Sequence, residues 1–131
     1  MDKSIIKQIS DAIVSKDNFI KINEQRRAGH TTAALDSVIL YGALLIVPKT
    51  LFKYTSDSLR KRCQDFGINE KLYLGYLKNL ISNPNQLIGK KTTGRIIVFD
   101  TYYIQDSKTI REYESIIRNP RLTVILQSKE Y

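Results

Sequence analysis

The sequence of 131 residues holds one cysteine, one histidine, one methionine and no tryptophan. With a single cysteine, Cys63, the chain offers no disulfide framework and no cysteine-based metal site. One histidine beside one cysteine also argues against a zinc site and against a Cys–His nucleophile pair. Cys63 falls on the apolar side of a predicted helix, where a thiol packs as a small hydrophobe. This cysteine usage fits a reducing compartment, and we expect a cytoplasmic location.

Long apolar runs are missing as well. The longest, such as "ALLIVP", are too short to span a membrane, and charges recur every few residues over 1–18, so neither a membrane segment nor a signal peptide is predicted. With 6 glycines, 3 prolines, 42% hydrophobic and 26% charged residues, the composition is typical of a globular protein. The length and the lack of internal repeats predict a single domain over residues 1–131.

Acidic residues are the scarcer charge, because 13 Asp and Glu stand against 21 Lys and Arg, for a net charge of +8. An excess of this size favours a polyanionic partner such as nucleic acid, but it fits a solvated basic surface equally well. The basic residues are scattered, with modest clusters at Arg26–Arg27, Arg60–Lys61–Arg62 and Lys90–Lys91. A fold that gathers them on one face would favour nucleic acid.

Apolar periodicity predicts alternating helices and strands. Helices are expected over 2–16, from Thr31 or Thr32 onward, and over 51–68, 69–85 and 107–120, and strands over 18–23, 42–49, 94–103 and 121–127. The stretch "GALLIVPK" (42–49) is continuously apolar, which is typical of a central parallel strand, and Pro48 should end it. Strands separated by helices pair in parallel. The predicted fold class is therefore α/β, a three-layer sandwich with a short parallel sheet of about four strands.

The stretch "RRAGHTTAAL" (26–35) joins the first predicted strand to a predicted helix. In such a loop, backbone N–H groups and the helix N-terminus can bind phosphate. The phosphate-binding pattern Gly-x-x-x-x-Gly-Lys-Ser/Thr covers Glu24 to Thr31, where Gly29 and Thr31 match, Glu24 replaces the first glycine and His30 replaces the lysine. The structural alternative is that Thr31 or Thr32 is an N-cap and that His30 only closes the loop.

A second motif, "RIIVFD", ends an apolar strand with Asp100, which is how a magnesium-supporting acid is presented. Together with "RRAGHTTAAL", "GALLIVPKT" and "LTVILQS", in that order over about residues 18 to 128, it makes the chain resemble the P-loop NTPase superfamily, in particular its helicase- and recombinase-like core, with a degenerate Walker A motif. The resemblance implies a parallel sheet whose fourth strand lies between the first and the third. It also implies Mg-ATP as cofactor, Thr31 and Asp100 as magnesium ligands, and Asp100 as the catalytic, Walker B-like residue.

The resemblance further implies one ligand-binding edge at the carboxyl ends of the strands. The residues expected to bind nucleotide or phosphate are Arg26, Arg27, Gly29, His30, Thr31 and Thr32. The residues expected to line a nucleic-acid or ligand edge are Lys49, Tyr102, Tyr103, Gln127 and Lys129. Tyr102 and Tyr103 are candidates for stacking on a base, and equally for covering the core.

Two departures argue against fast hydrolysis. A neutral imidazole at His30 is a poor substitute for the lysine that stabilises charge on the transferred phosphate. The acid usually found directly after Asp100 is Thr101 here. If active, the protein would be an ATPase-type nucleoside triphosphate hydrolase, but the altered motifs favour weak activity or none.

Three hypotheses for the function stay open. The first is weak nucleotide or phosphate binding by a degenerate P-loop NTPase-like protein of nucleic-acid metabolism. The others are a non-catalytic DNA- or RNA-binding accessory protein and an interaction module that docks on a replication or recombination enzyme. The short basic chain resembles small accessory proteins of bacteriophages and other mobile elements, which would place it in the cytoplasm of a bacterial or archaeal host.

Overall fold

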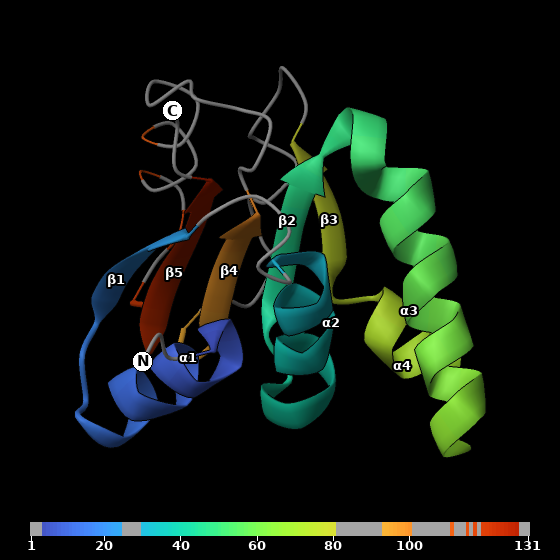
Figure 1. The fold of residues 1–131 in the computed structure, drawn as a ribbon, viewed down its shortest axis with the longest axis horizontal. Helices are drawn as coiled ribbons and strands as arrows, with labels where there is room; N and C mark the ends of the chain where they lie inside the picture. The colour runs from blue at the N-terminus through green and yellow to red at the C-terminus, as the bar shows by residue number, and fades with distance from the viewer. Residues whose placement is uncertain are drawn as a thin grey trace.

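A single parallel sheet organises the fold. The computed structural model describes residues 4–24, 30–80, 93–100, 111, 115, 117 and 119–128. Within them the strands are β1 (Phe19–Glu24), β2 (Leu44–Pro48), β3 (Leu77–Leu80), β4 (Ile96–Asp100) and β5 (Leu122–Ser128). The five strands stand in the order β1-β5-β4-β2-β3, and every neighbouring pair is parallel (Figure 1).

The α/β class and the parallel pairing predicted from the sequence are confirmed, and so is the position of the last strand, β5, between β1 and β4. The predicted central strand is also confirmed. Residues Leu44 to Val47 are buried, and β2 pairs with β4 on one side and with β3 on the other. The strand ends at Pro48, which has no N–H to donate.

The described helices follow the predicted ones closely at the start of the chain. They are α1 (Ile5–Val14), α2 (His30–Tyr41), α3 (Phe52–Phe66), which follows a 3₁₀ turn η1 (Lys49–Leu51), and α4 (Glu70–Leu74). Helix α2 begins at His30, one residue before the predicted start. Helix α3 ends at Gly67 in the left-handed conformation, with φ 66°, where a glycine has no Cβ to clash. None of the described helices is long and apolar enough to cross a membrane.

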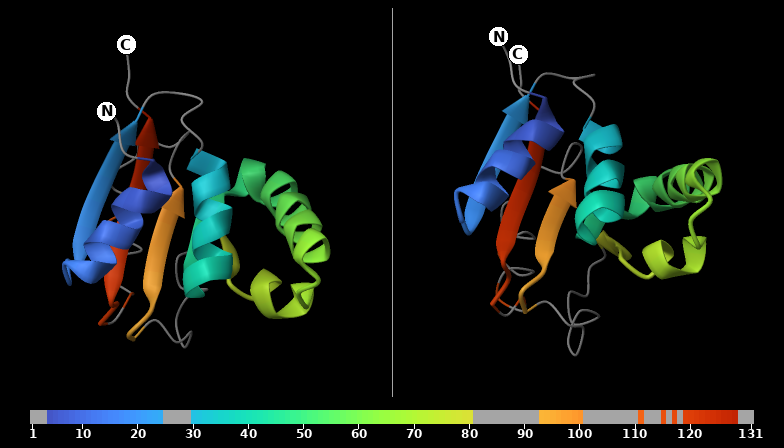
Figure 2. Two further views of the ribbon diagram at one scale, coloured as in Figure 1. Left: turned by 60° about the horizontal axis from the view of Figure 1, so that its bottom comes forward. Right: turned by 90° about the horizontal axis from the view of Figure 1, so that it is seen from below.

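Buried apolar side chains form two clusters on opposite faces of the sheet, because successive residues of a strand point to opposite sides. The helix face of the sheet, covered by α1, α2 and α3 (Figure 2), carries Leu45, Val47, Val98, Leu122, Val124 and Leu126. The far face carries Leu44, Ile46, Ile97, Phe99 and Ile125. Ile117 packs against the far face from the segment predicted as the helix 107–120, in which Arg111 and Ser115 have helical backbone.

The predicted helix over 69–85 is wrong in its second half. Helix α4 ends at Leu74, and residues Leu77 to Leu80 form β3 at the edge of the sheet, so the sheet has one strand more than predicted. Strand β2 offers backbone groups on its outer side, and Leu45 N–H donates to the Tyr76 carbonyl at 2.8 Å. The hydrogen bonds of this pairing override the helical spacing of the apolar residues, because propensity is a weak prior against tertiary contacts. Residues 81–85 lie outside the described part.

Candidate functional site at the carboxyl edge of the sheet

The carboxyl ends of the parallel strands meet at one edge of the sheet, where open α/β sheets bind ligands. Strand β4 ends there at Asp100 and β5 at Ser128, while β1 ends at Glu24 and leads toward α2. Register places Asp100 opposite Leu126, which itself stands opposite Ile22 of β1. Because neighbouring strands are about 4.8 Å apart, β4 lies about 10 Å from β1 across β5.

Helix α2 begins at this edge. In Figures 1 and 2 its N-terminal end lies beside the carboxyl end of β4, and the helix packs against β4 and β2. Its first turn contains His30, Thr31 and Thr32 and no acidic residue, and the Thr32 side chain is exposed. The first N–H groups of a helix have no intrahelical partner and carry partial positive charge. The edge beside β4 therefore presents hydrogen-bond donors to an anion.

Asp100 is the carboxylate of this edge, and it is only 2% exposed. Val98 belongs to the helix face and Phe99 to the far face, so alternation along β4 assigns Asp100 to the helix face, the face that α2 covers. A buried carboxylate is costly unless hydrogen bonds or a cation compensate its desolvation. The structure thus brings an acid to the same edge and the same face as the start of α2.

The other predicted site residues are placed only in part. Lys49 is exposed at the start of η1, directly after β2, so it shares the carboxyl edge. Gln127 belongs to β5 and stands opposite Asn23 in register. Six predicted residues lie outside the described part of the chain: Arg26, Arg27, Gly29, Tyr102, Tyr103 and Lys129.

A magnesium site would rest on Thr31 and Asp100. Over the residues that the structure describes, no group of three or more His, Cys, Asp and Glu side chains could hold a metal ion. Mg²⁺ commonly takes one or two protein oxygens and completes its shell with water and phosphate oxygens, so this finding does not concern a site made of Thr31 and Asp100.

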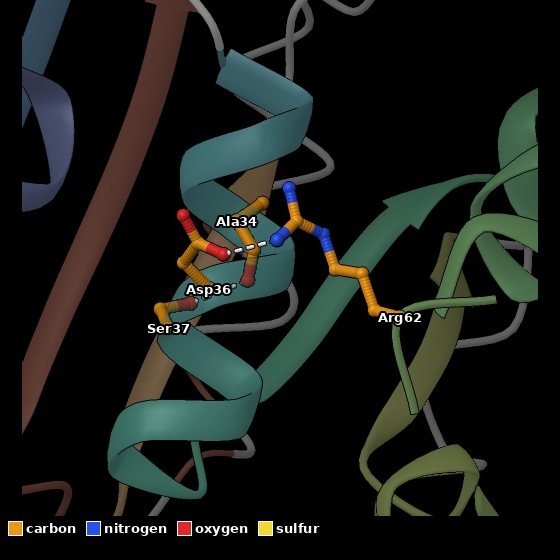
Figure 3. Close-up of polar contacts among 4 residues, drawn as sticks. All are labelled: Ala34, Asp36, Ser37 and Arg62. Atoms are coloured by element: carbon orange, nitrogen blue, oxygen red, sulfur yellow. Dashed lines mark hydrogen bonds and ion pairs between the residues drawn. The ribbon is translucent and has the colours of Figure 1, made fainter. Parts of the chain in front are cut away.

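An ion pair between α2 and α3 was missed from the sequence. Arg62 donates to Asp36, with 2.6 Å between Nη1 and Oδ1, and the two side chains are 26% and 31% exposed (Figure 3). Close by on α2, the buried Ser37 hydroxyl donates to the Ala34 carbonyl at 2.6 Å. Sequence alone gave no signal for the pair, because its partners are 26 residues apart and sit on separate helices.

Two more arginines bind helix ends at the opposite, amino edge of the sheet. Arg95, directly before β4, donates to the Gly42 carbonyl after α2 at 3.2 Å and stacks 4.2 Å from the ring centroid of Tyr76. Arg121, directly before β5, donates to the Ile13 carbonyl of α1 at 2.8 Å. A cation at a helix C-terminus meets the negative end of the helix dipole. Together with Arg62, these residues have structural roles that the net charge alone does not reveal.

Cys63 packs in the core, as predicted, with 0% exposure. Burial raises the pKa of its thiol, and the negative charge of Glu70 raises that pKa further. A thiol held protonated in an apolar setting is a poor nucleophile. Cys63 therefore takes no part in the candidate site.

Comparison with known proteins adds no assignment: no family model matches the chain, and no curated protein matches its sequence.

Proposed function

We propose that this chain is a P-loop NTPase-like domain of nucleic-acid metabolism, with an altered phosphate loop, that binds a nucleotide or another phosphate ligand with little or no hydrolysis. The observation that carries the proposal is the buried Asp100 at the end of β4, on the sheet face covered by α2. The position of β5 between β1 and β4 supports it, because the sequence resemblance implies that placement. The three-layer form of the fold belongs to the same proposal.

In this proposal the chain binds anions through α2 and magnesium through two oxygens. Phosphate oxygens accept hydrogen bonds from the N–H groups at the start of α2, where the helix dipole favours negative charge. Mg²⁺ would be held by Thr31 and Asp100 and would neutralise phosphate charge. Hydrolysis is slow because His30 stands in place of the lysine and Thr101 in place of the second acid.

A titration with Mg-ATP tests the proposal. We expect saturable binding that Asp100→Asn and Thr31→Ala weaken about tenfold or more, since each removes a ligand oxygen of the metal. Thr50→Ala is the matched control, because Thr50 is an exposed threonine of η1 at the same edge of the sheet. Equal affinities for Thr31→Ala, Thr50→Ala and the wild type would refute the assignment, provided that circular dichroism shows all variants folded.

The altered residue His30 gives a gain-of-function test. Lysine at this position would supply the cation of the phosphate-binding pattern, which His30 replaces in this chain. We therefore expect His30→Lys to raise the affinity for Mg-ATP at pH 7.5. A variant that binds no better than the wild type contradicts the phosphate-loop alignment.

A basic edge of the molecule supports nucleic acid as a second candidate ligand. Lys49 in η1 and Lys53 in the first turn of α3 are exposed, Tyr54 is 64% exposed, and residues 44–56 contain no acid. Phosphate contacts by lysine make binding salt-dependent, and each lost contact lowers the salt slope by about 1. The affinity of Lys49→Ala and of Lys53→Ala for single-stranded DNA should therefore depend less steeply on the salt concentration than the affinity of the wild type does. Lys71→Ala, which changes an exposed lysine of α4, is the control.

A further inference from the structure

The ion pair between Arg62 and Asp36 joins two helices, whereas the other ion pairs between described residues each lie within one helix. Arg60 and Asp57 are 3.7 Å apart within α3, and their side chains are 50% and 59% exposed. Lys7 and Asp11 lie within α1, also 3.7 Å apart. Arg62 instead reaches from α3 to the middle of α2 (Figure 3), with a contact of 2.6 Å and about half the exposure.

Among the described residues 32–36 near the start of helix α2, the buried apolar side chains are Ala33, Ala34 and Leu35. The two alanines let the helix approach the sheet but interlock little with it, so Leu35 is the one large apolar side chain among these residues that packs in the core. Asp36 is six residues from His30, about 9 Å along the helix axis. Across the contact, α3 is anchored in the core by Leu59 and Cys63, on either side of Arg62 in the sequence.

We propose that the Arg62–Asp36 pair positions α2, so that the N–H groups of its first turn keep one place relative to Asp100. The inference rests on the proposed phosphate site at this edge. It adds that an ion pair outside the site, between α3 and the middle of α2, holds the site's helix in place. Arg62 is a positioning residue, because it contacts α2 through Asp36. Its role is to keep the binding groups in the geometry that a ligand requires before the ligand arrives.

The pair should matter more for binding than for stability. Ion pairs of partly exposed groups contribute little to the free energy of unfolding, whereas binding groups must be held within about 0.5 Å of their working geometry. Without the pair, α2 samples positions that do not bind, and the affinity falls in proportion to the competent fraction. A competent fraction between a tenth and a third would weaken binding about three- to tenfold.

The experiment compares Arg62→Met and Asp36→Asn with Arg60→Met, which removes a guanidinium from the same helix but breaks only a contact within it. Arg62→Lys and the charge-reversed double variant Asp36→Arg/Arg62→Asp test rescue. Affinities are measured for Mg-ATP and for inorganic pyrophosphate. Hydrogen exchange of the backbone amides 34–41 is measured without ligand, and thermal unfolding of every variant is recorded.

We expect Arg62→Met and Asp36→Asn to weaken both affinities about three- to tenfold and to speed exchange in α2, with partial recovery in the rescue variants. Arg60→Met should match the wild type in both measurements. Wild-type exchange and affinity in Arg62→Met, or equal losses in Arg60→Met, would overturn the inference. If the wild type binds neither probe, the proposed function fails, and exchange in α2 decides the positioning role by itself.

Discussion

Replacing Arg121 with methionine tests whether a basic residue at the amino edge of the sheet holds the fold together. Its guanidinium donates to the carbonyls of Ile13 and Asp17, at 2.8 and 3.3 Å. These contacts join the end of α1 to the start of β5, more than 100 residues later in the chain. Methionine keeps most of the apolar stem, so the substitution removes mainly the two charge-assisted hydrogen bonds.

The expected loss follows from the exposure of the two bonds. A hydrogen bond to a charged group contributes about 1.5–3 kcal/mol net when it is well shielded from solvent. The bond to Ile13 is partly buried and the longer bond to Asp17 is exposed, so we expect about 1–2 kcal/mol for the pair, including the interaction with the helix dipole. For a chain of this length that corresponds to a decrease in Tm of about 3–8 °C.

Urea denaturation followed by far-ultraviolet circular dichroism measures this loss. Arg60→Met is the control, because Arg60 pairs only with a neighbour on its own helix and should change stability by less than about 0.5 kcal/mol. The midpoint for Arg121→Met should fall without a change in the slope, since the folded state buries the same surface. If the two variants unfold at the same urea concentration, the hydrogen bonds of Arg121 to Ile13 and Asp17 contribute nothing to stability, and the reasoning is refuted.

Three further predictions concern the core and a helix end. Phe99→Ala, at a fully buried position of the far face, should lower stability by about 3–5 kcal/mol, whereas Phe66→Ala, 63% exposed, should lower it by less than about 0.5, both by urea denaturation. Gly67→Ala should lower stability by about 1–2 kcal/mol because φ is 66°, and Gly75→Ala, where φ is −63° and a Cβ meets nothing closer than 3.6 Å, should not. Cys63 should react slowly with a thiol reagent until the protein unfolds. Its raised pKa keeps the thiol protonated in the folded state. The stability difference between the wild type and Cys63→Ala should therefore stay constant below about pH 8.5. Above that pH the difference should shrink, because the thiol ionises in the unfolded state before it ionises in the folded state.

The buried strands could be predicted because the residues of each strand alone indicate its burial. Four consecutive apolar residues in β2 and the run before Asp100 in β4 are typical of strands covered on both faces. Asp100 itself was predictable as the polar residue that ends such a run. Its assignment to the helix face needed the structure, because it depends on which face Val98 contacts.

Strand β3 and the Arg62–Asp36 pair could not be predicted, for a common reason. Residues 77–80 become a strand because β2 offers its outer edge, and Arg62 turns toward α2 because two helices pack side by side. Both depend on contacts between segments far apart in sequence, to which a periodicity within one segment is blind. The start of α2 was predictable to within one residue because the glycine, the threonines and the alanines that mark it are adjacent.

The arginines and the lysines contribute differently to the positive surface of the protein. Arg62, Arg95 and Arg121 are half-buried and donate to a carboxylate or to carbonyls of the protein, which suits the planar fork of a guanidinium. The lysines whose side chains the structure describes are all exposed, among them Lys49 and Lys53 at the carboxyl edge. The positive surface that a polyanion meets in this part of the chain is therefore carried largely by lysine. Lysine binds phosphate as a point charge and reads no base pattern, so any nucleic acid held at this edge should be bound through its backbone and released by salt.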